Sequence, residues 1–350
     1  MKNRIEGIVS LLYIILLTFF SIFAYQLALD TTPNANQMHL SIHSQPPGFE
    51  TQVLLLPLTD TFSTTGSFFW GTPSSVEEIP IQSWRFEKGQ LEIQPYGSPT
   101  GYYKPVSMSR VPTPHTQEAL ASNWIINKTF PLGTDKFGRD LLSRLLIGSR
   151  ISLAIGFVAV FLSLLIGITL GALAGYFGGI LDRAIMAFIN VVWSIPTLLL
   201  VIGITLVLGR GFWQVFIAVG LSMWVEVARL VRGQVLAVKE RTYIEAAHAL
   251  GFSNYRIIFS HILPVITGPI IVIASANFAS AILIESGLSF LGIGAQPPVP
   301  SWGGMVKEHF RYLLLGKPYL ALLPGFAIMS LVLAFMTLGN VLRDYLDVKT

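Results

Sequence analysis

The sequence predicts an all-α membrane protein with six transmembrane helices and a small insertion of mixed or β character on the outer side. Of its 350 residues, 52% are hydrophobic and only 12% are charged, whereas a soluble domain carries about 25% charged residues. Six apolar stretches reach or approach the roughly 20 residues that a bilayer span requires. Residues 29–130 contain no such stretch and are rich in Pro, Ser, Thr and Gly. We therefore expect an N-terminal tail and helix over 1–28, an insertion over 29–130, and five further helices within 131–350.

The six expected spans follow from the positions of the apolar stretches. They are Ile8–Leu27, a stretch within Ile151–Leu181, Ala184–Leu208, Phe212–Leu230, Ile262–Ile284 and Tyr319–Leu342. The first exceeds the roughly 7–15 apolar residues of a signal peptide, which favours an uncleaved anchor. Pro196 is expected to kink the third span. Gly167, Gly171 and Gly175 have the four-residue spacing that lets helices pack closely, so they predict a packing seam.

The distribution of basic residues predicts the orientation. Lys and Arg are enriched in the short loops that lie on the cytoplasmic side of the membrane. One such group lies between the fourth and fifth spans: Arg229, Arg232, Lys239, Arg241 and Arg256. With six spans, both termini then lie in the cytoplasm. The basic residues before the second span fall on the outer side and violate this rule, although long translocated segments largely escape it. The net charge of +4 is scattered and gives no basic face for nucleic acid.

Two short alternating segments predict a β-hairpin within the insertion. Trp84 and Phe86 alternate with polar residues, and Leu91 and Ile93 do so again after Lys88-Gly89. Alternation on both sides of a glycine turn is typical of paired strands. We expect a small external subdomain, with a partly ordered loop as the alternative.

The segment Arg241–Pro264 is too charged to span a membrane and predicts two short helices separated at Gly251. Ala246 and Ala247 remove side-chain bulk beside Glu245, so a partner protein could approach the backbone there. Three residues at helical spacing predict an apolar face: Tyr255, Ile258 and Phe259. The alternative is an amphipathic connector without a partner.

This segment resembles the EAA loop of ABC importer permeases. Glu245-Ala246-Ala247 is followed after three residues by Gly251 and later by His261-Ile262-Leu263-Pro264, and this last tetrapeptide is similar to the peptide-permease branch. Further stretches are similar to the second permease subunit of dipeptide and oligopeptide importers: Leu132–Asp135, Gly138–Asp140, Leu288–Gly292 and Pro300–Gly303. The resemblance covers the first span and residues 131–350.

The resemblance implies a type I ABC importer permease (MetI-like) fold, with a coupling loop at about 232–263 that docks on an ATPase subunit. It implies four kinds of partner: a second homologous permease, one or two ABC ATPase subunits, an extracytoplasmic binding protein and membrane lipid. The implied location is the cytoplasmic (inner) membrane of a bacterium, and the implied cargo is di- or oligopeptides. Nickel, glutathione and oligosaccharides remain alternative cargoes.

The residues expected to couple to the ATPase are Glu245, Ala246, Ala247, Gly251 and Pro264. A gating or pathway role is expected for Glu285, Ser289 and Trp302. For Glu285 the reason is that ionisable groups within spans usually face a cavity or a partner, with a carboxylate that reaches water at the interface as the alternative. Trp302 and its neighbouring prolines are expected to form a stiff external lip, with contact to the binding protein as the alternative. Glu226 is expected to pair with Arg229.

No phosphate-binding G-x-x-x-x-G-K-[ST] loop, catalytic triad or metal-ligand set occurs in the sequence. We therefore expect no catalytic, cofactor or metal site in this chain, with ATP and Mg²⁺ bound by the partners. A stand-alone secondary transporter would need charge relays or paired broken helices, and a membrane enzyme would need a catalytic constellation. Neither pattern is evident.

Overall fold

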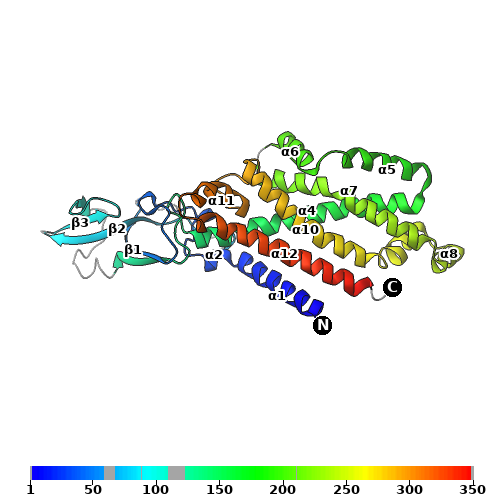
Figure 1. Ribbon diagram of the computed structural model, residues 1–350, viewed down its shortest axis with the longest axis horizontal. Coiled ribbons are helices and arrows are strands. Elements are labelled where there is room, and N and C mark those ends of the chain that lie inside the picture. Colours follow the sequence, from blue (N-terminus) through cyan, green and yellow to red (C-terminus); the bar gives the residue numbers. More distant parts are fainter. Residues whose placement is uncertain (1, 59–67, 88, 109–122, 210, 348–350) are drawn as a thin grey trace.

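The computed structural model describes residues 2–58, 68–87, 89–108, 123–209 and 211–347. The molecule is elongated, with a β-sheet at one end, a helical bundle in the middle and the short helix α8 (Thr242–Ala249) at the opposite end (Figure 1). Both chain termini lie towards the α8 end of the bundle. The chain therefore separates its β-structure from the predicted ATPase-binding segment by the full length of the bundle.

Five helices of the described chain are long and apolar enough to cross a membrane. They are α1 (Lys2–Ile22), α4 (Leu141–Phe177), α7 (Phe212–Lys239), α10 (Thr267–Leu291) and α12 (Tyr319–Asp347). The stretch expected to form the third span is divided into α5 (Gly179–Trp193) and α6 (Thr197–Leu208), which meet at 92°. Proline lacks an N–H and disfavours helix in the residue before it, so Pro196 separates two helices where we expected only a kink. The six expected spans are found only if this bent pair counts as one.

Two predicted boundaries are wrong because polar residues extend the helices. Helix α4 begins at Leu141, ten residues before the predicted stretch, where the Asp140 carboxylate accepts a hydrogen bond from the Ser143 N–H and caps it. Helix α7 continues to Lys239, so the loop predicted from about 232 begins at 240. The Lys239 ammonium donates to the Tyr176 carbonyl at 2.6 Å, and this bond stabilises the added turns.

The predicted glycine seam is confirmed in the packing of α4 against α7. A Cβ atom built at Gly167, Gly171 or Gly175 would lie 2.5, 2.5 or 2.9 Å from its nearest α7 atom. Only glycine permits this approach, which brings α4 into contact with the α7 backbone at Ala228 and Arg232. The two helices therefore form the central pair of the bundle.

The insertion contains a five-stranded antiparallel sheet of order β4-β3-β2-β1-β5. Its strands are β1 (Phe49–Pro57), β2 (Val76–Glu87), β3 (Gln90–Pro95), β4 (Lys104–Val106) and β5 (Ile125–Phe130). The predicted hairpin is confirmed, because Trp84 pairs with Ile93 and Phe86 pairs with Leu91. Lys88 of its turn lies outside the described residues.

Short helices and side-chain hydrogen bonds join the sheet to the bundle. The connecting segment contains α2 (Ala24–Leu27) and the 3₁₀ turns η1 (Pro33–Ala35) and η2 (Leu40–Ile42). The Ser143 hydroxyl of α4 accepts from the Asp30 N–H at 2.9 Å, and the Tyr319 hydroxyl of α12 donates to the Gln45 carbonyl at 2.7 Å. These bonds hold the connecting segment against the bundle.

Candidate functional site

The segment 240–266, here called the elbow, folds as the sequence predicts around a break at Gly251. Helix α8 ends where the Gly251 N–H donates to His248 O at 2.9 Å and the Phe252 N–H donates to Ala247 O at 3.1 Å. These two bonds, with Gly251 at φ +76°, form a Schellman motif, in which glycine avoids the strain of a left-handed backbone. Helix α9 (Asn254–Ile257) then begins with Ser253 as its N-cap. The glycine thus sets the direction of the second helix.

The two alanines that follow Glu245 differ in exposure. Glu245 and Ala246 are exposed, as a docking surface requires, but Ala247 is only 3% exposed and packs in the apolar cluster of α4 and α7. The prediction that both alanines admit a partner is therefore wrong for Ala247, whose small size serves internal packing. Ile258 is likewise buried and belongs to the same cluster.

An apolar patch remains exposed at the tip of the elbow. Leu250 is 74% exposed, Tyr255 71% and Phe259 52%. The rings of Tyr255 and Phe259 lie 4.4 Å apart and form one surface. Large apolar residues gathered in this way mark an interaction site rather than a surface adapted to water.

The residue that connects the elbow to the bundle is Tyr176, which our sequence analysis missed. Its hydroxyl donates to Asn254 Oδ1 at 2.8 Å, and its ring stacks on that of His248 with centroids 6.1 Å apart. Tyr176 therefore joins the C-terminal end of α4 to both short helices of the elbow. The sequence signal is slight: one tyrosine at the end of an apolar stretch, just before Gly178-Gly179.

Pro264 lies exposed in the turn between η4 (Ile258–Ile262), a π-helical turn, and α10. The Leu263 N–H still donates to Ile258 O at 2.9 Å, but proline has no N–H to continue the pattern. The predicted second helix therefore ends before Pro264, as expected, and helix α10 starts at Thr267.

The predicted gating residues gather towards the sheet end of the helical bundle, away from the elbow. The Ser289 hydroxyl donates to Glu285 Oε1 at 2.7 Å, and Ser301 donates to Ser289 at 3.3 Å. Trp302, at the start of α11 (Trp302–His309), is buried and donates its indole N–H to Leu145 O at 2.9 Å. The structure thus brings Glu285, Ser289 and Trp302 together, with Glu285 fully buried inside α10 rather than at its end.

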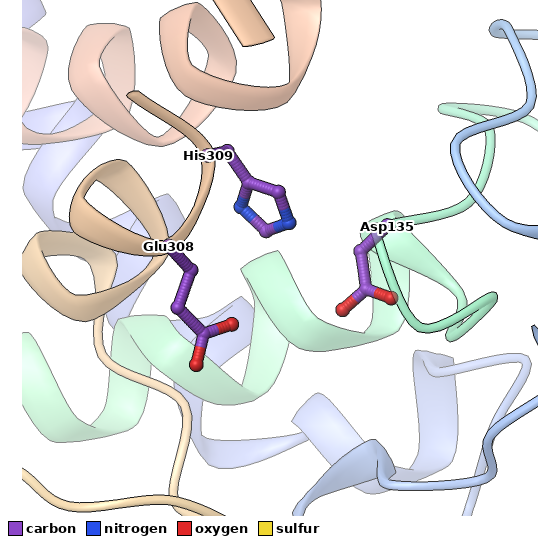
Figure 2. Close-up of side chains that lie close together, drawn as sticks. All are labelled: Asp135, Glu308 and His309. Carbon is purple, nitrogen blue, oxygen red and sulfur yellow. The ribbon is translucent and has the colours of Figure 1, made fainter. Parts of the chain in front are cut away.

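A second polar cluster lies beside this group. Figure 2 shows Asp135, Glu308 and His309 facing one another from two segments far apart in sequence, close enough for one metal ion. Arg139 already donates to Asp135 at 2.6 Å and to Glu308 at 3.1 Å. Burial lowers the pKa of His309 against the opposing charge of Asp135, and its Nδ1 donates to Met305 O at 2.8 Å. The arginine occupies the carboxylates, so the geometry fits an ion-pair network better than a metal site.

The predicted pairing of Glu226 with Arg229 is wrong. The Arg229 guanidinium lies over the Trp193 ring, 4.1 Å from its centroid, and the described residues show no ion pair between it and Glu226. A guanidinium gains from the π-face of tryptophan, and Trp193 here lies at the end of the neighbouring helix α5. The side chain of Glu226 is exposed.

Comparison with known proteins identifies a family and several similar transport proteins. Residues 167–350 match the family described as binding-protein-dependent transport system inner membrane component. A dipeptide transport system permease protein of Alkalihalophilus pseudofirmus is 42% identical over 68% of this chain and 76% of its own length. A glutathione transport system permease protein of Pectobacterium atrosepticum is 44% identical over 62% and 72%.

Among solved structures, an inward-facing form of the MetNI methionine ABC transporter aligns with a TM-score of 0.47 and 21% identity, over 58% of this chain and 96% of that one. The assignment rests on the sequence matches, which extend over the glycine seam, the elbow and the buried Glu285–Ser289 pair. With its long apolar helices and an exposed elbow at one end of the bundle, this multi-pass membrane protein belongs to the family of binding-protein-dependent inner membrane components, the permeases of ABC importers.

Proposed function

We propose that this chain forms half of the pathway of an importer that carries short peptides across the cytoplasmic membrane of a bacterium. One observation supports coupling to an ATPase: an exposed apolar patch lies on the elbow, beside the helix end at Gly251 and at the end of the bundle opposite the sheet. The cargo is suggested by the relatives, which are named for dipeptide and glutathione transport. Glutathione is itself a small peptide derivative, so both names favour peptide-like cargo.

The partners follow from this assignment. A second, homologous permease would complete the pathway, and one or two ABC ATPase subunits would dock on the elbow and bind ATP and Mg²⁺. An external binding protein would deliver cargo at the sheet end. In this orientation the elbow and both termini are cytoplasmic, while the insertion over 29–130 is extracytoplasmic. The chain itself would need no cofactor and catalyse no reaction.

The elbow offers a direct route from the ATPase to the membrane helices. A partner that moves the patch of Leu250, Tyr255 and Phe259 displaces α8 and α9 together, because Tyr176 contacts residues on both sides of Gly251. The same tyrosine belongs to α4, which packs along α7 without intervening side chains at its glycines. Rigid-body switching between two packed states is then driven by differences in ATPase contact between those states.

The test replaces Gly251 by Pro and, as a matched control, by Asn. Proline cannot donate the bond to His248 O or adopt φ +76°, whereas asparagine tolerates the left-handed conformation. In a reconstituted importer, Gly251→Pro should lose transport and the stimulation of ATPase activity by loaded binding protein. Gly251→Asn should retain most of both, and membrane insertion should be equal for the two variants.

Full transport by Gly251→Pro would refute the coupling role of the elbow. Cargo is tested separately by uptake of labelled dialanine, trialanine and glutathione into proteoliposomes that contain the complete importer. Uptake of none of the three would refute the peptide assignment even if the elbow proved to be the coupling element.

A further inference from the structure

A cavity of about 580 Å³ opens at the sheet end of the bundle, between α11, the loop after α10 and the segment before α4. Its charged lining is strongly unbalanced: Lys136, Arg144, Lys307 and Arg311 against one carboxylate, that of Glu308. The size is that of a small-molecule site, which typically measures about 300–1,000 Å³. The proposed pathway does not by itself require this excess of cations.

The central cation of this sheet-end cavity is Arg144, which is only 3% exposed. Its Nε atom has no hydrogen-bond partner, and its Nη1 atom makes only long contacts of 3.4 and 3.5 Å with backbone carbonyls of Asn34 and Ala35. The closest carboxylate oxygen, Asp135 Oδ2, lies 3.6 Å away. That oxygen already accepts a bond from Arg139 Nε at 2.6 Å. A buried arginine is therefore left with a long, shared ion-pair contact and no hydrogen bond at Nε, which is costly unless an anion completes the site.

The other carboxylate at the cavity does not neutralise the remaining cations. Glu308 is held by Arg139 Nη2 at 3.1 Å, and the same arginine also holds Asp135. These two carboxylates therefore balance Arg139 and Arg144 in charge, and the other cations of the lining remain in excess: Lys136, Lys307 and Arg311. The Lys307 ammonium lies close to Gly292: its Nζ atom is 2.3 Å from the position that a Cβ atom on this glycine would take. The ammonium therefore lies beside the C-terminal end of α10, at the cavity wall. Lys307 and Arg144 thus supply positive charge from two different elements.

We propose that the sheet-end cavity binds the terminal carboxylate of the peptide cargo as it leaves the binding protein. Guanidinium groups bind carboxylates through paired, charge-assisted hydrogen bonds, and Arg144 makes no such bond with a carboxylate among the described residues. The enclosed position of Arg144 favours a small terminal group over the flat surface of a docked protein. The inference rests on the proposed peptide cargo and adds the end of the peptide that this chain recognises.

The cavity also adjoins the buried group on α10. Ser289 lines it and donates to Glu285, while Ser301 lines it and donates to Ser289. A carboxylate that enters beside these hydroxyls would meet two hydrogen-bond donors: Ser289, whose present acceptor is Glu285, and Ser301, whose present acceptor is Ser289. Occupancy of the cavity is therefore placed to alter the contacts of α10, the helix that carries Glu285 and Ser289.

The experiment uses the complete permease–ATPase complex in phosphatidylcholine nanodiscs without the binding protein, titrated calorimetrically with trialanine and with trialanine amide. The amide lacks the negative charge and is otherwise matched. We expect the acid to bind at least tenfold more tightly than the amide. The double variant Lys307→Gln/Arg311→Gln, which leaves Arg144 in place, should weaken that preference. Lys104→Gln, on the edge of the sheet, controls for the loss of an exposed cation.

Equal binding of acid and amide by the wild-type complex, or an unchanged preference in the double variant, would overturn the inference. So would a double variant that kept the preference and lost only its affinity for the binding protein in a parallel titration with that protein, since the cavity would then be a docking surface. Uptake of labelled trialanine by the complete importer is measured in parallel. Normal uptake without any preference refutes the carboxylate site alone, whereas no uptake by the wild type refutes the proposed cargo and the inference together.

Discussion

Replacing Gly171 by Ala should weaken the packing of α4 on α7. The new Cβ atom would lie 2.5 Å from the Ala228 carbonyl oxygen and 2.9 Å from Val231 Cβ, both well inside van der Waals contact. Overpacking of this kind costs about 1–3 kcal/mol, and the better helix propensity of alanine offsets about 1 kcal/mol of it. We expect a net loss of up to about 2 kcal/mol for Ala, and a larger loss for Val.

The measurement is thermal unfolding of the detergent-solubilised chain, followed by the fraction that remains monodisperse. A loss of this size should lower the midpoint by a few degrees. Gly233→Ala on α7 is the matched control, because no atom lies within 4 Å of its added Cβ; its midpoint should stay equal or rise. Equal midpoints for the Gly171 and Gly233 variants would show that the close approach of the two helices does not limit stability.

Two further predictions concern charged pairs. Contacts with His39 and Lys128 outweigh the cost of burial and lower the pKa of Glu78 from 4.5 to about 2. This carboxylate should therefore contribute on the order of 3 kcal/mol above pH 4.5 and lose that contribution as the pH falls towards 2. Acid unfolding of the sheet followed by tryptophan fluorescence should show this loss in the wild type and not in Glu78→Gln. Asp182 and Arg232 form a two-bond pair at 2.5 and 2.7 Å between α5 and α7. Removing either partner should cost about 1 kcal/mol, and a double-mutant cycle on the melting midpoint that gave no coupling energy would contradict the pairing.

Local patterns predicted the parts of the molecule that depend on neighbouring residues. Alternation at Trp84 and Phe86 gave the correct strand pairing, and Gly251 marked the end of α8 because its backbone conformation favours glycine. The four-residue glycine spacing identified the α4 seam because helical periodicity places those residues on one face. In each case the physical cause lies within a few residues of the signal.

The failures involve partners that are remote in sequence. Hydropathy measures the length of an apolar stretch and not its direction, so the 92° turn at Pro196 was not predicted. Arg229 lies over Trp193 on another helix, and Lys239 extends α7 by bonding to the end of α4. The sheet-end cavity likewise joins residues from about 136 to 315, whose proximity exists only after folding.

Helix α4 is one uninterrupted element that reaches both ends of the bundle. Its 37 residues, at a rise of about 1.5 Å each, make it about 55 Å long. Arg144 lies in its first turn, and Tyr176 is its penultimate residue. Because a hydrogen-bonded helix barely stretches, axial sliding of Tyr176 must shift Arg144 by nearly the same distance. A nucleotide-dependent pull at one membrane face would then change the shape of a binding site at the other, with no relay of intermediate side chains.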